Sequence, residues 1–241
     1  MTPRERLIVA LDVPRAEAAR ELVARLAGRV GLFKVGSQAF TAAGPELVRE
    51  IVARGERVFL DLKFHDIPNT VAGSVASAAR LGVSLATVHG LGGRAMLEAA
   101  AGALPAMGTK LLAITVLTSH DEAALREIGV GSGIPDSVRR LALLARDAGI
   151  DGVVASPHEV PLIREACGPG FLIVTPGIRP AGAAAFDQAR AATPAVALAA
   201  GADYLVVGRP ITEAADPAAA ADAIVREMEA SSSRRAQGVS G

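Results

Sequence analysis

The sequence has 241 residues, with 25 basic and 25 acidic side chains, so its formal net charge at pH 7 is zero. A chain with no excess of positive charge lacks the basic surface that binds a phosphate backbone, which argues against nucleic acid as the main partner. Its apolar runs are far shorter than the roughly 20 residues of a membrane span, and 51% hydrophobic residues suffice for a sizeable core, so we expect a soluble protein that does not enter a membrane.

The cysteine content and the two ends of the chain lead to three further expectations. The sequence contains one cysteine, Cys167, and does not open with the pattern of a secretory signal, so we expect a cytoplasmic protein without an internal disulfide. No linker or shift in composition divides the chain, which predicts one domain over residues 1–230. Residues 231–241 show no periodicity and are expected to form a disordered tail.

Strand-like and helix-like segments alternate along the chain. Eight short apolar runs predict strands at Leu7–Leu11, Gly31–Val35, Val58–Leu62, Ser84–His89, Leu111–Leu117, Gly152–Ala155, Phe171–Thr175 and Tyr204–Val207. Between them, helical spacing predicts helices, for example at Ala16–Leu26, Glu46–Arg54, Thr70–Leu81, Arg94–Ala103, Ser137–Ala148 and Pro217–Met228. Continuous apolar strands are typical of a parallel sheet covered by helices on both faces. Eight such units in about 250 residues predict a single-domain (β/α)8 TIM barrel, with an open doubly wound sheet as the alternative.

Two intervals between the predicted strands depart from this pattern. The gap from Leu117 to Gly152 is long enough for an extra helix around residues 121–128, so the loops after the fifth strand should be enlarged. Residues 179–189 consist mostly of small residues with Pro and Gly, and this segment is a candidate lid.

Polar residues stand at the ends of several predicted strands. In a (β/α)8 barrel, chemistry is carried at the carboxyl ends of the strands. The residues at or just after these ends are Asp12, Lys34, Asp61, Lys63, Thr118, Arg179, Gly208 and Arg209. Because a charge buried near a strand end is costly unless it is paired, the lysines and carboxylates should form an alternating network at one rim.

The spacing D-x-K-x-x-D places three charges together after the third predicted strand. Asp61 and Lys63 are two residues apart on a strand, so both side chains should point into the barrel. Asp66 follows three residues later, in the loop. The spacing alone is also compatible with a structural ion cluster that closes the mouth of the barrel.

The longer string FLDLKFHDIPNT, residues 59–70, resembles the orotidine 5′-phosphate decarboxylase family. The resemblance covers nearly the whole chain in order, up to about Met228. Its further motifs are ALD around Asp12, FKVG around Lys34, VLTS around Thr118, TPGIRP at Thr175–Pro180 and VVGRPI at Val206–Ile211. One departure is the segment AAAFDQAR, which contains Gln188 and replaces a more acidic stretch.

The resemblance implies decarboxylation of orotidine 5′-phosphate to UMP and carbon dioxide in pyrimidine nucleotide biosynthesis, without a metal or an organic cofactor. Loss of the carboxylate leaves an electron pair on C6 in the plane of the pyrimidine, where the ring carbonyls do not delocalise it. Preorganised positive charge must therefore stabilise it locally. By resemblance Lys63 is this cation and the proton donor to C6, and the carboxylates of Asp61 and Asp66 favour its charged form.

The resemblance also implies the other contacts of the substrate. Lys34 and Asp12 are implied to bind the ribose hydroxyls, with Lys34 also touching Asp61. The remaining implied contacts are Thr118 near the pyrimidine, Arg179, Gln188, Gly208 and Arg209 at the phosphate, and Ile67 and Thr70 after the third strand. The family further implies a homodimer in which each active site receives Asp66 and its neighbours from the other subunit.

Two other functions remain open at this point. The D-x-K-x-x-D spacing also resembles that of Mg²⁺-dependent sugar-phosphate decarboxylases or synthases of the same superfold. The segments IPNT and TPGIRP and the residue Thr118 favour the nucleotide enzyme. A non-catalytic barrel that binds a phosphate ligand is the second alternative. It is disfavoured because retaining several buried charges without use would be costly.

Overall fold

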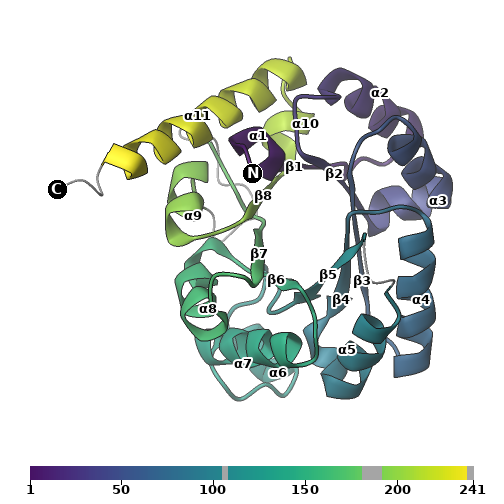
Figure 1. Ribbon diagram of the computed structural model, residues 1–241, viewed down its shortest axis with the longest axis vertical. Coiled ribbons are helices and arrows are strands. Elements are labelled where there is room, and N and C mark those ends of the chain that lie inside the picture. Colours follow the sequence, from purple (N-terminus) through teal and green to yellow (C-terminus); the bar gives the residue numbers. More distant parts are fainter. Residues whose placement is uncertain (105–107, 181–191, 238–241) are drawn as a thin grey trace.

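The protein folds into a closed barrel of parallel strands with helices around it (Figure 1). The computed structural model describes residues 1–104, 108–180 and 192–237. In these residues the strands pair in chain order, and β8 returns to pair with β1. They are β1 Leu7–Ala10, β2 Leu32–Gly36, β3 Val58–Phe64, β4 Leu85–His89, β5 Lys110–Ile114, β6 Gly152–Val154, β7 Leu172–Thr175 and β8 Tyr204–Val207. The predicted (β/α)8 barrel is confirmed, and the closing pair excludes the open sheet.

The barrel buries both faces of its strands, as the continuous apolar runs predict. One set of side chains fills the interior and includes Ile8, Leu32, Phe59, Leu85 and Leu112. The intervening side chains pack against the helices and form a larger outer core. Because side chains alternate along a strand, a polar residue two positions after an interior apolar residue points into the barrel mouth.

The helices that cover the barrel follow the strands along the chain. They are α1 Pro3–Arg6, α2 Ala16–Leu26, α3 Ser37–Ala53, α4 Pro68–Arg80, α5 Gly93–Gly102, α6 Glu122–Glu127, α7 Ile134–Asp147, α8 Val160–Cys167, α9 Pro194–Ala200, α10 Arg209–Thr212 and α11 Pro217–Gln237. Short 3₁₀ turns lie at Gly90–Gly92 and Pro157–Glu159. The extra helix expected around residues 121–128 is α6. Within the described ranges, no helix is long and apolar enough to cross a membrane.

Several element ends differ from the sequence expectations. Strand β3 continues two residues beyond Leu62, whereas β5 stops three residues before Leu117. Helix α3 begins at Ser37, well before the expected start at Glu46. It is interrupted at Gly44, which has a φ of 65° and stands directly before Pro45. Helix α11 runs to Gln237, beyond the expected helix end at Met228, and the expected disordered tail over residues 231–241 stays a prediction. Residues 238–241 lie outside the described part.

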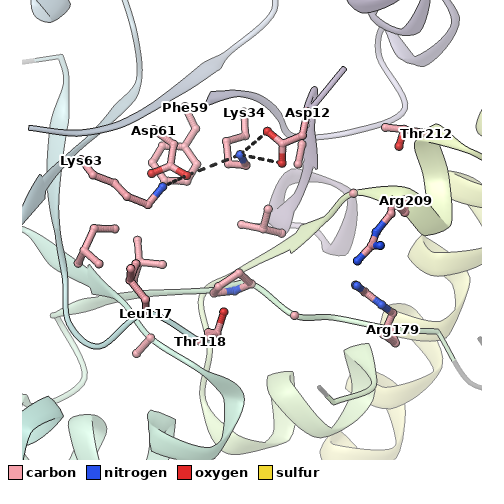
Figure 2. Close-up of a pocket in the computed structure, with 18 of the residues that line it drawn as sticks. Asp12, Lys34, Phe59, Asp61, Lys63, Leu117, Thr118, Arg179, Arg209 and Thr212 are labelled. Carbon is pink, nitrogen blue, oxygen red and sulfur yellow. Dashed lines mark hydrogen bonds and ion pairs between the residues drawn. The ribbon is translucent and has the colours of Figure 1, made fainter. Parts of the chain in front are cut away.

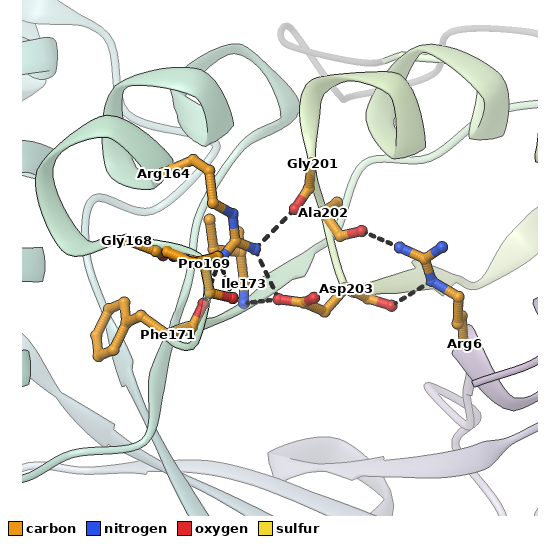
Figure 3. Close-up of polar contacts among 9 residues, drawn as sticks. All are labelled: Arg6, Arg164, Gly168, Pro169, Phe171, Ile173, Gly201, Ala202 and Asp203. Atoms are coloured by element: carbon orange, nitrogen blue, oxygen red, sulfur yellow. Dashed lines mark hydrogen bonds and ion pairs between the residues drawn. The ribbon is translucent and has the colours of Figure 1, made fainter. Parts of the chain in front are cut away.

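Polar contacts close the amino end of the barrel, opposite the expected site (Figure 3). The Arg164 guanidinium, on α8, donates to backbone carbonyls of Phe171 and Gly201 and to the carboxylate of Asp203, at 2.7–2.8 Å. Asp203 also accepts the backbone N–H of Ile173 at 2.8 Å. These bonds tie α8 to the starts of β7 and β8, at the end of the barrel away from the expected site.

Candidate active site

A cavity of about 430 Å³ opens at the carboxyl ends of the strands (Figure 2). Its size is within the range of small-molecule sites. The residues that the sequence analysis selected and that line it are Asp12, Lys34, Asp61, Lys63, Thr118, Arg179, Gly208 and Arg209. The structure therefore brings eight of the expected site residues to one place.

Four of these residues form a row of alternating charges along one wall (Figure 2). Lys34 Nζ lies 2.9 Å from Asp12 Oδ1 and 3.6 Å from Asp61 Oδ2. Asp61 Oδ2 lies in turn 2.9 Å from Lys63 Nζ. The predicted alternation is confirmed, and Lys63 is at the end of the row.

The two middle members of the row are buried. Lys34 and Asp61 are each only 8% exposed, because they occupy interior positions on β2 and β3. A buried charge is tolerated when it is paired and hydrogen-bonded, and here each has opposite charge beside it. Gly36 makes room for the first pair, since a Cβ atom there would lie 2.9 Å from Asp12 Oδ1 and 3.0 Å from Lys34 Nζ.

Lys63 has an unusual backbone conformation. Its φ is 52°, the left-handed region, and within the described residues it is the only non-glycine residue with a positive φ. This conformation costs an L-residue about 1–2 kcal/mol. It falls where the pairing of β3 with β4 is irregular, between Leu60 and Phe64. Strained backbone of this kind is found where the surrounding structure fixes it, often at functional sites.

Two arginines face each other at the other end of the cavity (Figure 2). Arg179 follows β7, and Arg209 follows β8 at the start of α10. Burial lowers the pKa of Arg179, and the positive charge of Arg209 lowers it further. Among the described residues, the Nε atom of Arg179 is buried without a hydrogen-bond partner. Two converging guanidinium groups, one with an unused buried donor, fit an anionic ligand.

Gly208 lies beside these arginines on the cavity wall. A Cβ atom at this position would meet only Ala10 Cβ within 4 Å, at an ordinary 3.7 Å. The protein alone therefore leaves space for a side chain here. A bound anion that approaches the backbone of Gly208 would use this space.

The wall between the two charged ends is mostly apolar. Thr118 lies four residues after the end of β5, and not at a strand end as expected, because β5 is shorter than its apolar run. The neighbouring lining residues are Ile114, Val116, Leu117, Val154 and Ala155. An apolar wall suits the face of a flat ring, and the one hydroxyl offers a hydrogen bond to a polar group on the edge of that ring.

Sequence reasoning missed some polar lining residues. Thr212 and Glu213, at the end of α10, belong to the cavity wall. The signal that could have found them is proximity, because they lie within four residues of Arg209.

Three expected site residues do not line the cavity of their own chain. Asp66 is exposed, and its Oδ1 accepts the backbone N–H of Ile67 at 2.6 Å. The described residues contain no ion pair between Asp66 and Lys63. Ile67 is 66% exposed, and Thr70 lines a separate groove beside α4. A fourth expected residue, Gln188, and most of the candidate lid at 179–189 lie outside the described residues.

Two histidines stack at the rim beside this loop. The rings of His65 and His89 have centroids 5.1 Å apart and an interplanar angle of 16°. His89 Nδ1 accepts the backbone N–H of Leu91 at 3.3 Å. Burial lowers the pKa of His89, and the positive charges of His65, Lys63 and His120 lower it further. Burial and these neighbouring charges therefore favour the neutral form of His89.

Comparisons with known proteins agree with this geometry. The sequence pattern of the orotidine 5′-phosphate decarboxylase / HUMPS family matches residues 5–224. A curated orotidine 5′-phosphate decarboxylase from Moorella thermoacetica is 56% identical over 237 residues, covering 95% of this chain and 94% of the relative. One from Halorhodospira halophila is 59% identical over 227 residues, covering 93% and 96%.

Solved structures show the same fold. The crystal structure of orotidine 5′-phosphate decarboxylase from Lactobacillus acidophilus superposes with a TM-score of 0.83 at 41% identity, covering 92% of this chain and 98% of that one. A conserved protein of Geobacillus kaustophilus gives a TM-score of 0.80 at 38% identity, covering 92% and 99%. With its barrel, its charged row and its near full-length relatives, the chain belongs to the orotidine 5′-phosphate decarboxylase / HUMPS family.

Proposed function

We propose that this cavity decarboxylates orotidine 5′-phosphate, giving UMP and carbon dioxide in pyrimidine nucleotide biosynthesis. The chain is then an enzyme of the carboxy-lyase class. Relatives named for this activity match 93–95% of the chain at 52–59% identity, and they favour neither a sugar-phosphate synthase nor a non-catalytic barrel. The observation that carries the proposal is the row of alternating charges that ends at Lys63, 2.9 Å from Asp61.

Lys63 supplies the positive charge that the reaction needs. When the bond from C6 to the carboxylate breaks, its electron pair stays on C6 and carbon dioxide leaves. The Lys63 ammonium stabilises this negative charge and then donates a proton to C6, and the resulting neutral amine regains a proton from water. Asp61, which is itself paired with Lys34, holds the ammonium in place before the reaction, so little reorganisation is needed when the charge develops.

The rest of the cavity binds the nucleotide. The phosphate lies between Arg179 and Arg209 and against Gly208, because these groups supply positive charge and open backbone there. Asp12 and Lys34 bind the ribose hydroxyls, and Thr118 contacts the pyrimidine. Binding energy from the remote phosphate can then be used to order the reacting groups, so the phosphate supports turnover as well as affinity.

A homodimer completes the site in this proposal. Asp66 is exposed in its own chain, and the next residue, Ile67, leaves a large apolar side chain in water. A groove between α3 and α4 adjoins this loop, and the partly exposed apolar side chains of Phe40, Leu62 and Phe64 line it together with polar ones such as Arg49 and Arg80. Exposed apolar surface of this kind is typical of a contact with another protein. In this proposal a second copy of the chain covers this surface. Each chain then inserts its Asp66, Ile67 and Thr70 into the site of the other chain, where Asp66 lies beside Lys63.

We place the enzyme in the cytoplasm, since its one cysteine forms no internal disulfide and its substrate belongs to nucleotide biosynthesis.

The decisive assay follows the ultraviolet absorbance of orotidine 5′-phosphate with purified protein, in buffer and in excess EDTA, with UMP identified by chromatography. We expect conversion to UMP at equal rates in both buffers. Absence of UMP would contradict the activity, and loss of the rate in EDTA would favour the Mg²⁺-dependent alternative.

A further inference from the structure

The hydroxyl of Thr87 contacts two of the four residues of the charged row. Thr87 is on β4, is fully buried, and is two residues after Leu85, which belongs to the barrel interior. A hydroxyl can donate one hydrogen bond and accept others. Thr87 Oγ1 accepts the backbone N–H of Lys63 at 2.8 Å and donates to Asp61 Oδ1 at 3.0 Å. One group thus contacts both residues of the D-x-K pair.

The bond to Asp61 fixes the orientation of its carboxylate. Oδ1 is held by Thr87, whereas Oδ2 faces Lys63 Nζ at 2.9 Å and Lys34 Nζ at 3.6 Å. Each oxygen therefore has its own partners. Without the hydroxyl, only the ion pairs with the two lysines would restrain the soft terminal torsion of this carboxylate, so its orientation would be less well fixed.

The bond to Lys63 supports its left-handed backbone. The pairing of β3 with β4 passes from Leu60 opposite Ala86 directly to Phe64 opposite Val88. Three residues of β3 therefore face Thr87 alone, and this bulge interrupts the regular ladder. The N–H of Lys63 bonds to the Thr87 hydroxyl, so the buried donor is satisfied in a conformation that an L-residue rarely adopts.

We propose that Thr87 is a positioning residue that places the Lys63 ammonium, acting at once on the backbone of Lys63 and on its carboxylate partner Asp61. Thr87 is not among the residues that line the cavity, so it acts through these two and not on the substrate. The inference rests on the proposed role of Lys63. It predicts that the hydroxyl matters for the chemical step and little for binding, because the phosphate and ribose contacts lie elsewhere.

Two pairs of proteins isolate the hydroxyl: wild type against Thr87→Val, and Thr87→Ser against Thr87→Ala. In each pair, the protein without the hydroxyl should have a kcat for orotidine 5′-phosphate at least about tenfold lower, because misplacing a reacting group costs rate steeply. KM and the inhibition constant of UMP should change by less than about threefold. Hydrogen exchange of the peptide spanning residues 60–66 should be faster in the two proteins without the hydroxyl.

The matched control is Thr109→Val. Thr109 is also a buried threonine, and its hydroxyl donates to the Val83 carbonyl at 2.7 Å, next to the amino end of β5. This variant loses a buried hydroxyl and its hydrogen bond away from the site, and it should keep the wild-type kcat. If Thr87→Val does not fold, the Ser and Ala pair decides the question alone.

A fall in kcat smaller than tenfold in the hydroxyl-free proteins, or a loss expressed in KM, overturns the proposal. Lys63→Ala measured in parallel separates the two levels of the argument. If Lys63→Ala keeps its activity, the proposed role of Lys63 is wrong. If Lys63→Ala is inactive and the two Thr87 pairs show equal kcat values, only the role of Thr87 is wrong.

Discussion

Gly36 shows how one missing side chain shapes the charged row. Alanine at this position would place its Cβ within 3.0 Å of both Asp12 Oδ1 and Lys34 Nζ, and its φ of −89° is open to any residue. Both atoms are ends of flexible side chains, so we expect Gly36→Ala to fold normally but to displace the pair. Its kcat/KM for orotidine 5′-phosphate should fall by about ten- to a hundredfold. Gly170→Ala, where a Cβ meets nothing within 4 Å, should behave as wild type; equal activity of the two variants would contradict this role.

His89 makes stability depend on pH. Its pKa lies below the ordinary value of about 6.5, because it is buried and near other positive groups. Between the lowered and the ordinary pKa the unfolded chain binds the proton and the folded protein does not, so the free energy of unfolding falls as the pH drops below about 6.5. Above that pH, His89 contributes no such dependence.

Urea unfolding at pH 7.5 and pH 5.5 measures this effect. We expect His89→Asn to lose less stability than wild type between the two pH values, because the titrating group is gone while an amide oxygen can still accept the Leu91 N–H. His158→Asn, which changes an exposed histidine, should retain the wild-type dependence. Identical pH dependence in wild type and His89→Asn would show that His89 is not responsible.

At the residue scale, the sequence predicts the charges of the site but not the groups that orient them. Asp61 and Lys63 are predicted to share a face because strand side chains alternate with a period of two. The left-handed backbone of Lys63 depends on a bulge and on a hydroxyl from β4, and no local pattern encodes either. A threonine inside an apolar run looks like an ordinary strand residue, so Thr87 attracts no attention.

At the scale of elements, Arg164 ties α8 to β7 and β8 at the end of the barrel away from the site (Figure 3). Arg164→Met keeps the apolar stem and removes all its donors, which leaves Asp203 and several carbonyls with fewer partners. We expect a loss of about 2–4 kcal/mol in the free energy of unfolding, measured in urea. The kcat should stay within about twofold of wild type, because Arg164 acts at the amino end of the barrel and the catalytic residues lie at the carboxyl ends of the strands.

Arg226→Met is the control for this prediction. It makes the same chemical change at an exposed position on α11 and should alter stability by less than about 0.5 kcal/mol. Equal free energies of unfolding for the two methionine variants would mean that the contacts of Arg164 contribute nothing to stability.

The sequence predicts the presence of the elements better than their ends. Apolar runs mark all eight strands because both faces of a parallel sheet are buried. The apolar run at Leu111–Leu117 is longer than β5 because Val116, although buried, belongs to the loop and lines the cavity.

At the scale of the whole molecule, the proposed dimer makes a distinctive prediction. If each site combines Lys63 of one chain with Asp66 of the other, inactive Lys63→Ala and inactive Asp66→Asn proteins should complement each other. A hybrid dimer has one doubly damaged site and one intact site, because a two-fold contact makes the two sites equivalent. With random exchange of equal amounts, about half the dimers are hybrids and about a quarter of all sites are intact.

Mass spectrometry of the mixed sample shows whether hybrids form. Decarboxylase activity should reappear as the hybrid dimers form. Hybrids without activity would mean that Asp66 serves its own chain or no site at all. Composition and spacing alone do not predict this arrangement, because an aspartate in an exposed loop is common. The fold adds the observation that Asp66 makes no ion pair with Lys63 in the described part of its own chain.

The most direct measurement is the rate at which Lys63→Ala decarboxylates orotidine 5′-phosphate, relative to wild type. The control is Lys110→Ala, which removes an exposed lysine at the start of β5, and circular dichroism verifies that both variants are folded. Lys63→Ala should lose essentially all activity, while Lys110→Ala should keep the wild-type rate. A folded Lys63→Ala whose rate stays within about tenfold of wild type, a barrier difference of only about 1.4 kcal/mol, would contradict the central role of Lys63.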